Sequence, residues 1–156
     1  MSTLSAAAEL TPARAALVAE IFARSAFTVD LGIAIGAIGP GWCTSSLELQ
    51  PRLLQQDGFA HAGVQATLAD HTAGAAAATL LEPGMTVLSI EFKVNLLRPA
   101  VGTLLRCRAQ VLRGGRTVSV VEAEVYAVDG QQEKLTAKAT VTLAVVPTPT
   151  SRKEHE

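Results

Sequence analysis

The chain of 156 residues carries a formal net charge of −1, with 17% charged and 4% aromatic residues. This length predicts one domain whose core needs no disulfide or metal staple. The basic residues are scattered and aromatic side chains are few, which excludes the positively charged face and the stacking platform typical of nucleic-acid-binding proteins.

Cys43 and Cys107 lie far apart in the sequence and lack the spacing of a metal or redox site, so we expect two buried, reduced thiols. The three histidines also lack ligand spacing, and we expect no metal. The N-terminus shows no basic segment followed by an apolar run, and the Ala-rich middle of the chain is interrupted by Asp70 and His71. We therefore expect a soluble, cytoplasmic protein without a membrane span.

Residues 1–10 show no strong pattern, and we expect a frayed N-terminus there. Thr11 then offers a capping hydroxyl, and Pro12 stands at the first helical position, where its missing N–H costs nothing. The apolar residues that follow recur on one side of a helical wheel. This pattern predicts an amphipathic helix over residues 11–27.

Two strand-like runs follow, at residues 31–38 and 42–50. Gly39-Pro40-Gly41 between them is a turn signal, so we expect a β-hairpin. The polar residues 52–57 predict an irregular connection to the next element.

The longest uninterrupted segment runs from Gly58 to Leu81 and consists mainly of small and apolar residues. Its length favours a helix over a strand, and its apolar residues surround the whole helical wheel. His61, Asp70 and His71 are its only ionisable residues. The segment therefore predicts a buried central helix that carries a carboxylate.

The sequence after Met85 alternates between apolar and polar residues in the manner of strands. Turn signals at residues 98–100, at Gly114-Gly115 and at Asp129-Gly130 divide it into four strands. A slip in the alternation between Val120 and Val121 indicates either a β-bulge or burial on both faces.

The predicted order is thus helix, two strands, long helix and four strands. A meandering antiparallel sheet of about six strands must bury its apolar face, and the long helix is the one apolar element of matching length. The sequence predicts a single α+β domain over residues 1–146, in which the sheet wraps the central helix. The polar tail, residues 147–156, is expected to be disordered.

Two motifs resemble a known family. Gly58-Phe59-Ala60-His61-Ala62-Gly63, followed by Leu68-Ala69-Asp70, resembles the G-x-x-H-G-G…L-A-D pattern of hotdog-fold acyl-CoA thioesterases of the phenylacetate-pathway (PaaI-like) type. Residues 89–100 resemble the S-x-E-x-K-x-N-x-x-R-P-A strand of the same family. The resemblance spans roughly residues 30–146. It implies a hotdog fold, hydrolysis of an acyl- or aryl-CoA thioester, no cofactor beyond the CoA of the substrate, and a homodimer or dimer of dimers.

The resemblance assigns the N-terminus of the central helix to the electrophilic part of the site. In this family a backbone N–H from the first glycine of the H-G-G triplet polarises the thioester carbonyl, and Ala62 occupies that position here. Alanine keeps this donor provided that its φ is negative, and the helix dipole suits a developing oxyanion. Asp70 is implied to act across a dimer interface, as nucleophile or as general base.

Four further residues are implied in the catalytic site. Gln55 matches a position that holds the nucleophilic water or the carbonyl, with Gln56 and Asp57 as rivals in the same loop. Ser89 matches a serine that orients the lytic water, although a plain hydroxyl at a strand start is an equal interpretation. His61 and Gly63 complete the first motif.

The sequence does not predict a Ser-His-Asp triad at His61, because it contains no G-x-S-x-G elbow and no candidate nucleophile adjoins His61. We expect its ring to order the loop at the helix start. His71 follows Asp70 directly, so the two side chains point about 100° apart on a helix and form no dyad. We expect His71 to be structural or to line a pocket.

The residues expected to meet the phosphates and adenine of CoA are Arg113, Gly114, Gly115 and Arg116, with Arg98 behind them; a solvated hairpin tip is the alternative interpretation. Two other functions stay open on the same fold. One is hydration or dehydration of an enoyl thioester, which usually needs a histidine opposite the acid. The other is acyl-CoA binding without catalysis.

Overall fold

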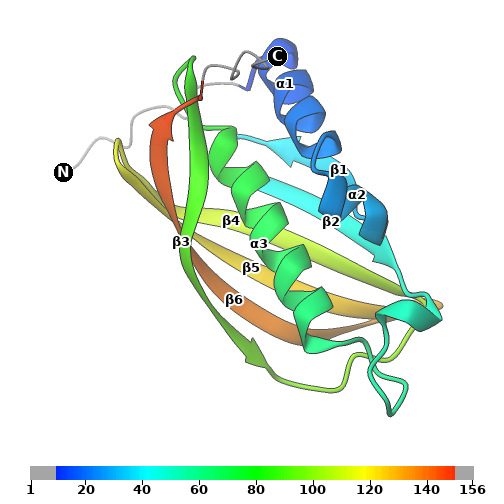
Figure 1. Ribbon diagram of the computed structural model, residues 1–156. Coiled ribbons are helices and arrows are strands. Elements are labelled where there is room, and N and C mark those ends of the chain that lie inside the picture. Colours follow the sequence, from blue (N-terminus) through cyan, green and yellow to red (C-terminus); the bar gives the residue numbers. More distant parts are fainter. Residues whose placement is uncertain (1–9, 150–156) are drawn as a thin grey trace, which may run out of the picture.

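The protein was analysed as a computed structural model, which describes residues 10–149 (Figure 1). Its helices are α1 (Pro12–Ala23), α2 (Ala26–Leu31), the short 3-10 helix η1 (Pro51–Leu53) and α3 (Ala62–Ala78). Its strands are β1 (Ala34–Gly39), β2 (Trp42–Glu48), β3 (Met85–Leu96), β4 (Leu104–Gly114), β5 (Val118–Asp129) and β6 (Gln132–Pro147).

The six strands form one antiparallel sheet in the order β1-β2-β4-β5-β6-β3. The sheet curves around α3, which lies along its concave face (Figure 1). β3 follows α3 directly in the chain but crosses to the far edge of the sheet, beside β6. The predicted fold, a central helix wrapped by a sheet of about six strands, is confirmed.

Small side chains on α3 allow the sheet to approach it closely. Every residue from Thr72 to Ala78 is buried, and the inward-facing residues of β4, β5 and β6 pack against this half of the helix. Those inward residues alternate with exposed or half-buried neighbours, as expected for a sheet with one solvated face. Cys43 and Cys107 are free, buried thiols within this core, as predicted.

The N-terminal region differs from the prediction. Instead of one helix over residues 11–27, α1 ends at Ala23 and a second helix, α2, begins at Ala26. The predicted strand at 31–38 therefore begins three residues late, at Ala34. Gly32, with a φ of 92°, ends α2 in the left-handed conformation that glycine adopts without a Cβ penalty.

The central helix is also shorter than predicted. It begins at Ala62, not at Gly58, and ends at Ala78, before a turn leads to Gly84. The slip in alternation near Val120 coincides with a bulge, but the extra residue is Leu112 on the neighbouring strand β4.

At the C-terminus, β6 extends to Pro147, and the Thr148 N–H donates to the Gly84 carbonyl oxygen over 2.8 Å. Ordered structure thus reaches past the predicted end of the domain at residue 146. The described residues do not include residues 1–9 of the predicted frayed N-terminus. They also do not include residues 150–156 of the predicted tail.

The edge strand β3 exposes much of its apolar surface. Phe92 and Leu96 pair with inward-facing residues of β6, yet their side chains are 49% and 53% exposed. Leu88 and Ile90 are each 58% exposed on the same strand. A long apolar edge strand of this kind is rarely left uncovered in a stable protein.

Among residues 10–149, no helix is both long and apolar enough to cross a membrane.

Candidate active site

The N-terminus of α3 presents one unpaired backbone donor. His61 is the N-cap residue, and its ring Nδ1 accepts a hydrogen bond of 2.9 Å from the Gly63 N–H. A side chain at position 63 would place its Cβ only 3.1 Å from this nitrogen, so glycine suits the capping geometry. The Ala62 N–H, by contrast, donates to no group within residues 10–149. His61 orders the helix start, as predicted, and leaves Ala62 as the free donor.

Alanine in place of the motif glycine does not disturb this backbone. No described residue other than glycine has a positive φ. The φ of Ala62 is therefore negative, as an alanine that keeps the backbone donor requires. The preceding loop is held on both sides. The His61 N–H donates to the Leu53 carbonyl oxygen over 2.9 Å, and the Ala60 N–H donates to the Ala100 carbonyl oxygen over 3.0 Å.

A cavity of about 340 Å³ lies at this end of α3. It brings together the predicted residues Gln55, Ala62 and Arg98 from three separate segments of the chain. The Gln55 side chain exchanges hydrogen bonds with Asp57, its Oε1 accepting from the Asp57 N–H, so the loop holds it locally. The rival residue Gln56 is exposed and donates to the same Asp57 carboxylate over 3.1 Å.

Gln65 is a site residue that the sequence did not reveal. It lines the same cavity, is only 3% exposed, and its Oε1 accepts a hydrogen bond of 2.8 Å from Thr136 Oγ1. Its position three residues after Ala62 places it on the adjoining helix turn. The sequence signal that could have pointed to Gln65 is its polar side chain within a mainly apolar helical segment.

The carboxylate of Asp70 is held by Ser89. Ser89 Oγ donates a hydrogen bond of 2.6 Å to Asp70 Oδ1, which joins β3 to α3. Ser89 points inward because it pairs with buried Leu143 on β6, and a bulge at Ile90 follows it. Ser89 lies within β3, four residues after its first residue Met85. Asp70 Oδ2 makes no hydrogen bond within the described residues.

Ala62 and Asp70 face the same general side of α3 but lie far apart along it. Eight residues at 1.5 Å per residue separate them by about 12 Å. Neither Asp70 nor Ser89 lines the cavity that contains Ala62 and Gln55. Within one chain the structure therefore builds two half-sites, one with the backbone donor and one with the carboxylate.

His71 points away from Asp70, as predicted. Its Nε2 lies 3.3 Å from Thr28 Oγ1 on α2, and its ring centroid lies 4.4 Å from that of Phe22 on α1. Burial beneath these helices lowers the pKa of His71 to about 4. The neutral ring packs as a structural group under the N-terminal helices.

The residues predicted to bind CoA do not come together within one chain. Gly114, Gly115 and Arg116 line a cavity of about 450 Å³ beside Leu81, at the C-terminal end of α3. Arg98 lies at the opposite end of the helix, and its Nη1 donates to the Leu135 carbonyl oxygen over 2.9 Å. Arg113 is exposed.

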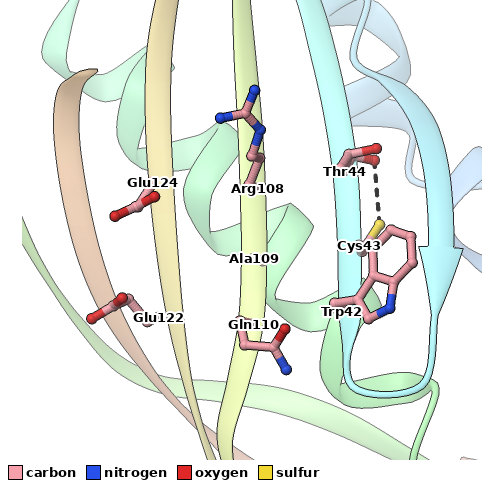
Figure 2. Close-up of a pocket in the computed structure, with 8 residues that line it drawn as sticks. All are labelled: Trp42, Cys43, Thr44, Arg108, Ala109, Gln110, Glu122 and Glu124. Carbon is pink, nitrogen blue, oxygen red and sulfur yellow. Dashed lines mark hydrogen bonds between the residues drawn. The ribbon is translucent and has the colours of Figure 1, made fainter. Parts of the chain in front are cut away.

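A further cavity, of about 340 Å³, lies on the outer face of the sheet (Figure 2). Arg108 on β4 and Glu122 and Glu124 on β5 line it, with α3 behind the strands. Lys138 Nζ lies 3.0 Å from Glu122 and 3.2 Å from Glu124. Arg108 is bound to Glu133 over 2.7 Å. Each of these three charged groups in the cavity thus has an ion-pair partner.

A long helix inside a curved antiparallel sheet, with a carboxylate on the helix and a free donor at its N-terminus, defines a hotdog-fold thioesterase. A sequence model of the thioesterase superfamily matches residues 57–134, which is half of the chain. The chain belongs to this superfamily. The family resemblance expected from the two motifs is thus confirmed.

Several relatives agree with this assignment. A putative esterase of Haemophilus influenzae is 30% identical over 74% of this chain and 82% of its own. A 1,4-dihydroxy-2-naphthoyl-CoA hydrolase of Listeria monocytogenes is 30% identical over 74% of this chain and 91% of its own.

Solved structures give the same result. A thioesterase family protein of Silicibacter pomeroyi has a TM-score of 0.84 and 38% identity, covering 86% of this chain and 99% of its own. The Escherichia coli PaaI protein, at 22% identity, covers 86% of this chain and 94% of its own with a TM-score of 0.76, and it shares the fold.

Proposed function

We propose that this protein hydrolyses acyl-CoA thioesters to the free acid and CoA. The observation that carries the proposal is the pair of groups on α3: an unpaired N–H at Ala62 and a carboxylate at Asp70 with one oxygen fixed by Ser89 and the other free. A thioester hydrolase needs a donor for the oxyanion and a base or nucleophile for the attack. The CoA thioester named for the Listeria relative supports the substrate class.

Two copies of the chain would complete each active site. The separation of about 12 Å prevents Ala62 and Asp70 of one chain from meeting at one carbonyl carbon. The uncovered apolar edge of β3, with Phe92 and Leu96 half exposed, is a surface on which a second copy could pair. In such a homodimer, or a dimer of dimers built from it, Asp70 of one copy faces the Ala62 N–H of the other.

The chemistry then follows from the two groups. As a general base, Asp70 takes a proton from water while the water oxygen bonds to the carbonyl carbon. The Ala62 N–H, aided by the helix dipole, stabilises the negative charge on the carbonyl oxygen. Collapse of this intermediate breaks the C–S bond, and the CoA thiolate leaves and takes up a proton. As a nucleophile, Asp70 would attack the carbon itself, expel the thiolate and leave an anhydride for water to hydrolyse.

Other polar groups take supporting roles in this proposal. Gln55 lines the cavity at Ala62 and can hold the water or the carbonyl oxygen. Arg98, in the same cavity, can meet a CoA phosphate of the substrate. The turn formed by residues 113–116 offers two exposed arginines at the other end of the helix for the CoA of a second site.

Release of the CoA thiol from a panel of acyl-CoA and aryl-CoA substrates tests the proposal. Wild type should release thiol, and Asp70→Asn should lose at least about a hundredfold in kcat, since it removes the base or nucleophile. Asp30→Asn, an exposed carboxylate on α2, is the matched control and should keep full activity. Unchanged activity in Asp70→Asn contradicts the mechanism. Hydration of an enoyl-CoA, or tight binding without turnover, would favour the two alternatives.

A further inference from the structure

The largest of the described cavities is an apolar groove that the catalytic chemistry does not use. Its volume is about 510 Å³, and it lies between α1, the C-terminal end of α3 and the start of β3. In Figure 1 the C-terminal end of α3 lies between α1 and β3. Its apolar walls include Leu17, Ile21, Phe22, Leu81, Met85 and Val87.

The groove and the Asp70 half-site lie along the same two elements. On β3, Val87 lines the groove, and Ser89, two residues further on and facing the same way, holds Asp70. On α3, Asp70, Gly74 and Ala78 follow one another at intervals of four residues, so they share one side of the helix. Ala78 lines the groove about 12 Å from Asp70 along the axis.

Gly74 and Phe22 form the boundary between the half-site and the groove. The Phe22 ring lies against α3 so closely that a Cβ added at Gly74 would meet its Cζ at 3.4 Å. The same ring lies against His71, with the two ring centroids 4.4 Å apart. A ligand that leaves the Asp70 carboxylate toward Ala78 therefore passes along Phe22.

The walls of the groove are mainly apolar, and Arg14 and Arg24 are its charged lining residues. No Asp or Glu lines the groove. The Arg14 guanidinium is directed to the end of α3, where its Nη2 donates to the Ala78 carbonyl oxygen over 2.8 Å. Leu17 and Ile21 are 41% and 38% exposed, although they are the apolar face of an amphipathic helix.

We propose that this groove binds the acyl chain of the thioester, and that the preferred substrates carry a straight aliphatic acyl group. The inference rests on the proposed function, because Asp70 fixes where the thioester carbonyl lies. The far carbons of the chain then lie against Leu17, Ile21 and Met85. Since Leu17 and Ile21 belong to α1, the chain-length preference depends on this N-terminal helix.

The test measures kcat/KM for butanoyl-, octanoyl-, dodecanoyl- and benzoyl-CoA on the full chain. Each methylene transferred from water to the groove raises kcat/KM by up to about fourfold. We expect octanoyl-CoA to exceed butanoyl-CoA by at least about tenfold.

Two matched variants locate the effect. Ala13 and Ala16 are both exposed alanines of α1, but only Ala13 lines the groove. Ala13→Trp should lower kcat/KM for dodecanoyl-CoA by about tenfold and leave butanoyl-CoA unchanged, whereas Ala16→Trp should change neither. Leu17→Lys, at a partly exposed position, should reproduce the loss without a large fall in melting temperature.

Four results would overturn the inference. Equal kcat/KM for all chain lengths, or a highest value for benzoyl-CoA that Ala13→Trp does not change, removes the groove from the site and leaves the thioesterase function intact. A loss with Ala16→Trp equal to that with Ala13→Trp has the same meaning. No hydrolysis of any of these thioesters would remove the proposed function, and the inference with it.

Discussion

Ser89 Oγ and Asp70 Oδ1 are joined by a hydrogen bond of 2.6 Å that connects the edge strand β3 to the central helix α3. The donor fixes one oxygen of the carboxylate and leaves Oδ2 without a hydrogen bond among the described residues. Because a rotating carboxylate would spend less time aligned with its target, Ser89 acts in our proposal as a positioning residue.

Ser89→Ala should therefore lower kcat by about tenfold without unfolding the protein, since it removes one hydrogen bond from a functional carboxylate. Steady-state thiol release measures this effect. Ser46→Ala, on β2 and away from both half-sites, is the matched control and should be neutral. If Ser89→Ala and Ser46→Ala have the same kcat, Ser89 does not position Asp70.

The free donor at Ala62 can be removed without damaging the helix. Proline lacks an N–H and is favoured at the first helical position, and the ψ of 141° at His61 suits a residue that precedes proline. Ala62→Pro should keep the melting temperature and lower kcat by about a hundredfold or more, as expected for loss of an oxyanion donor. Ala62→Gly keeps the N–H and should retain activity. Full activity in Ala62→Pro would rule out this donor.

The stability of the protein should fall in mild acid because of His71. Burial holds its pKa at about 4, below the ordinary value of 6.5. Between these two pH values the unfolded chain binds a proton that the folded protein does not bind, so the free energy of unfolding falls as the pH falls. Denaturant unfolding of wild type and His71→Gln across this range measures the effect. The difference in stability between the two should shrink toward pH 4, and a constant difference would contradict the assignment.

Both thiols should be inert in the folded protein. Burial raises the pKa of Cys43 and of Cys107 to about 12, so neither forms a thiolate near neutral pH. A thiol reagent such as 5,5′-dithiobis(2-nitrobenzoate) should react only as fast as the chain unfolds. Rapid labelling of either cysteine under native conditions would show that the core around it opens.

The sequence predicted those parts of the molecule in which local pattern and tertiary role agree. The small residues of α3 and the alternation in β3 to β6 predicted the helix and sheet, and two motifs pointed to Ala62, Asp70 and Ser89. By contrast, α2 was missed, because the predicted N-terminal helix ran to residue 27 without a break and the next predicted element began at residue 31. In the structure α1 ends at Ala23, and Gly32, in the left-handed conformation, ends a second helix.

Other features depend on contacts between distant segments. The slip in alternation between Val120 and Val121 left a β-bulge and burial on both faces open, because only the pairing register shows that Leu112 on β4 is the extra residue. Gln65 acquires its position through Thr136, which is far away in the chain. The groove beside α1 exists because α1 packs on β1 and α3 and leaves a space between itself and the start of β3. The separation of Ala62 from Asp70 follows from helical geometry once the helix is known.

The central claim is that Asp70 and the Ala62 N–H act on one thioester from two copies of the chain. Asp70→Asn and Ala62→Pro are each expected to be inactive alone. When they are unfolded together and refolded as a mixture, half of the dimers should be mixed, and each mixed dimer should contain one intact site.

The measurement is thiol release by this mixture. We predict recovery to about a quarter of wild-type activity, given random pairing in a two-fold symmetric dimer. Activity that stays at the average of the two separate variants, although mixed dimers have formed, would contradict the account.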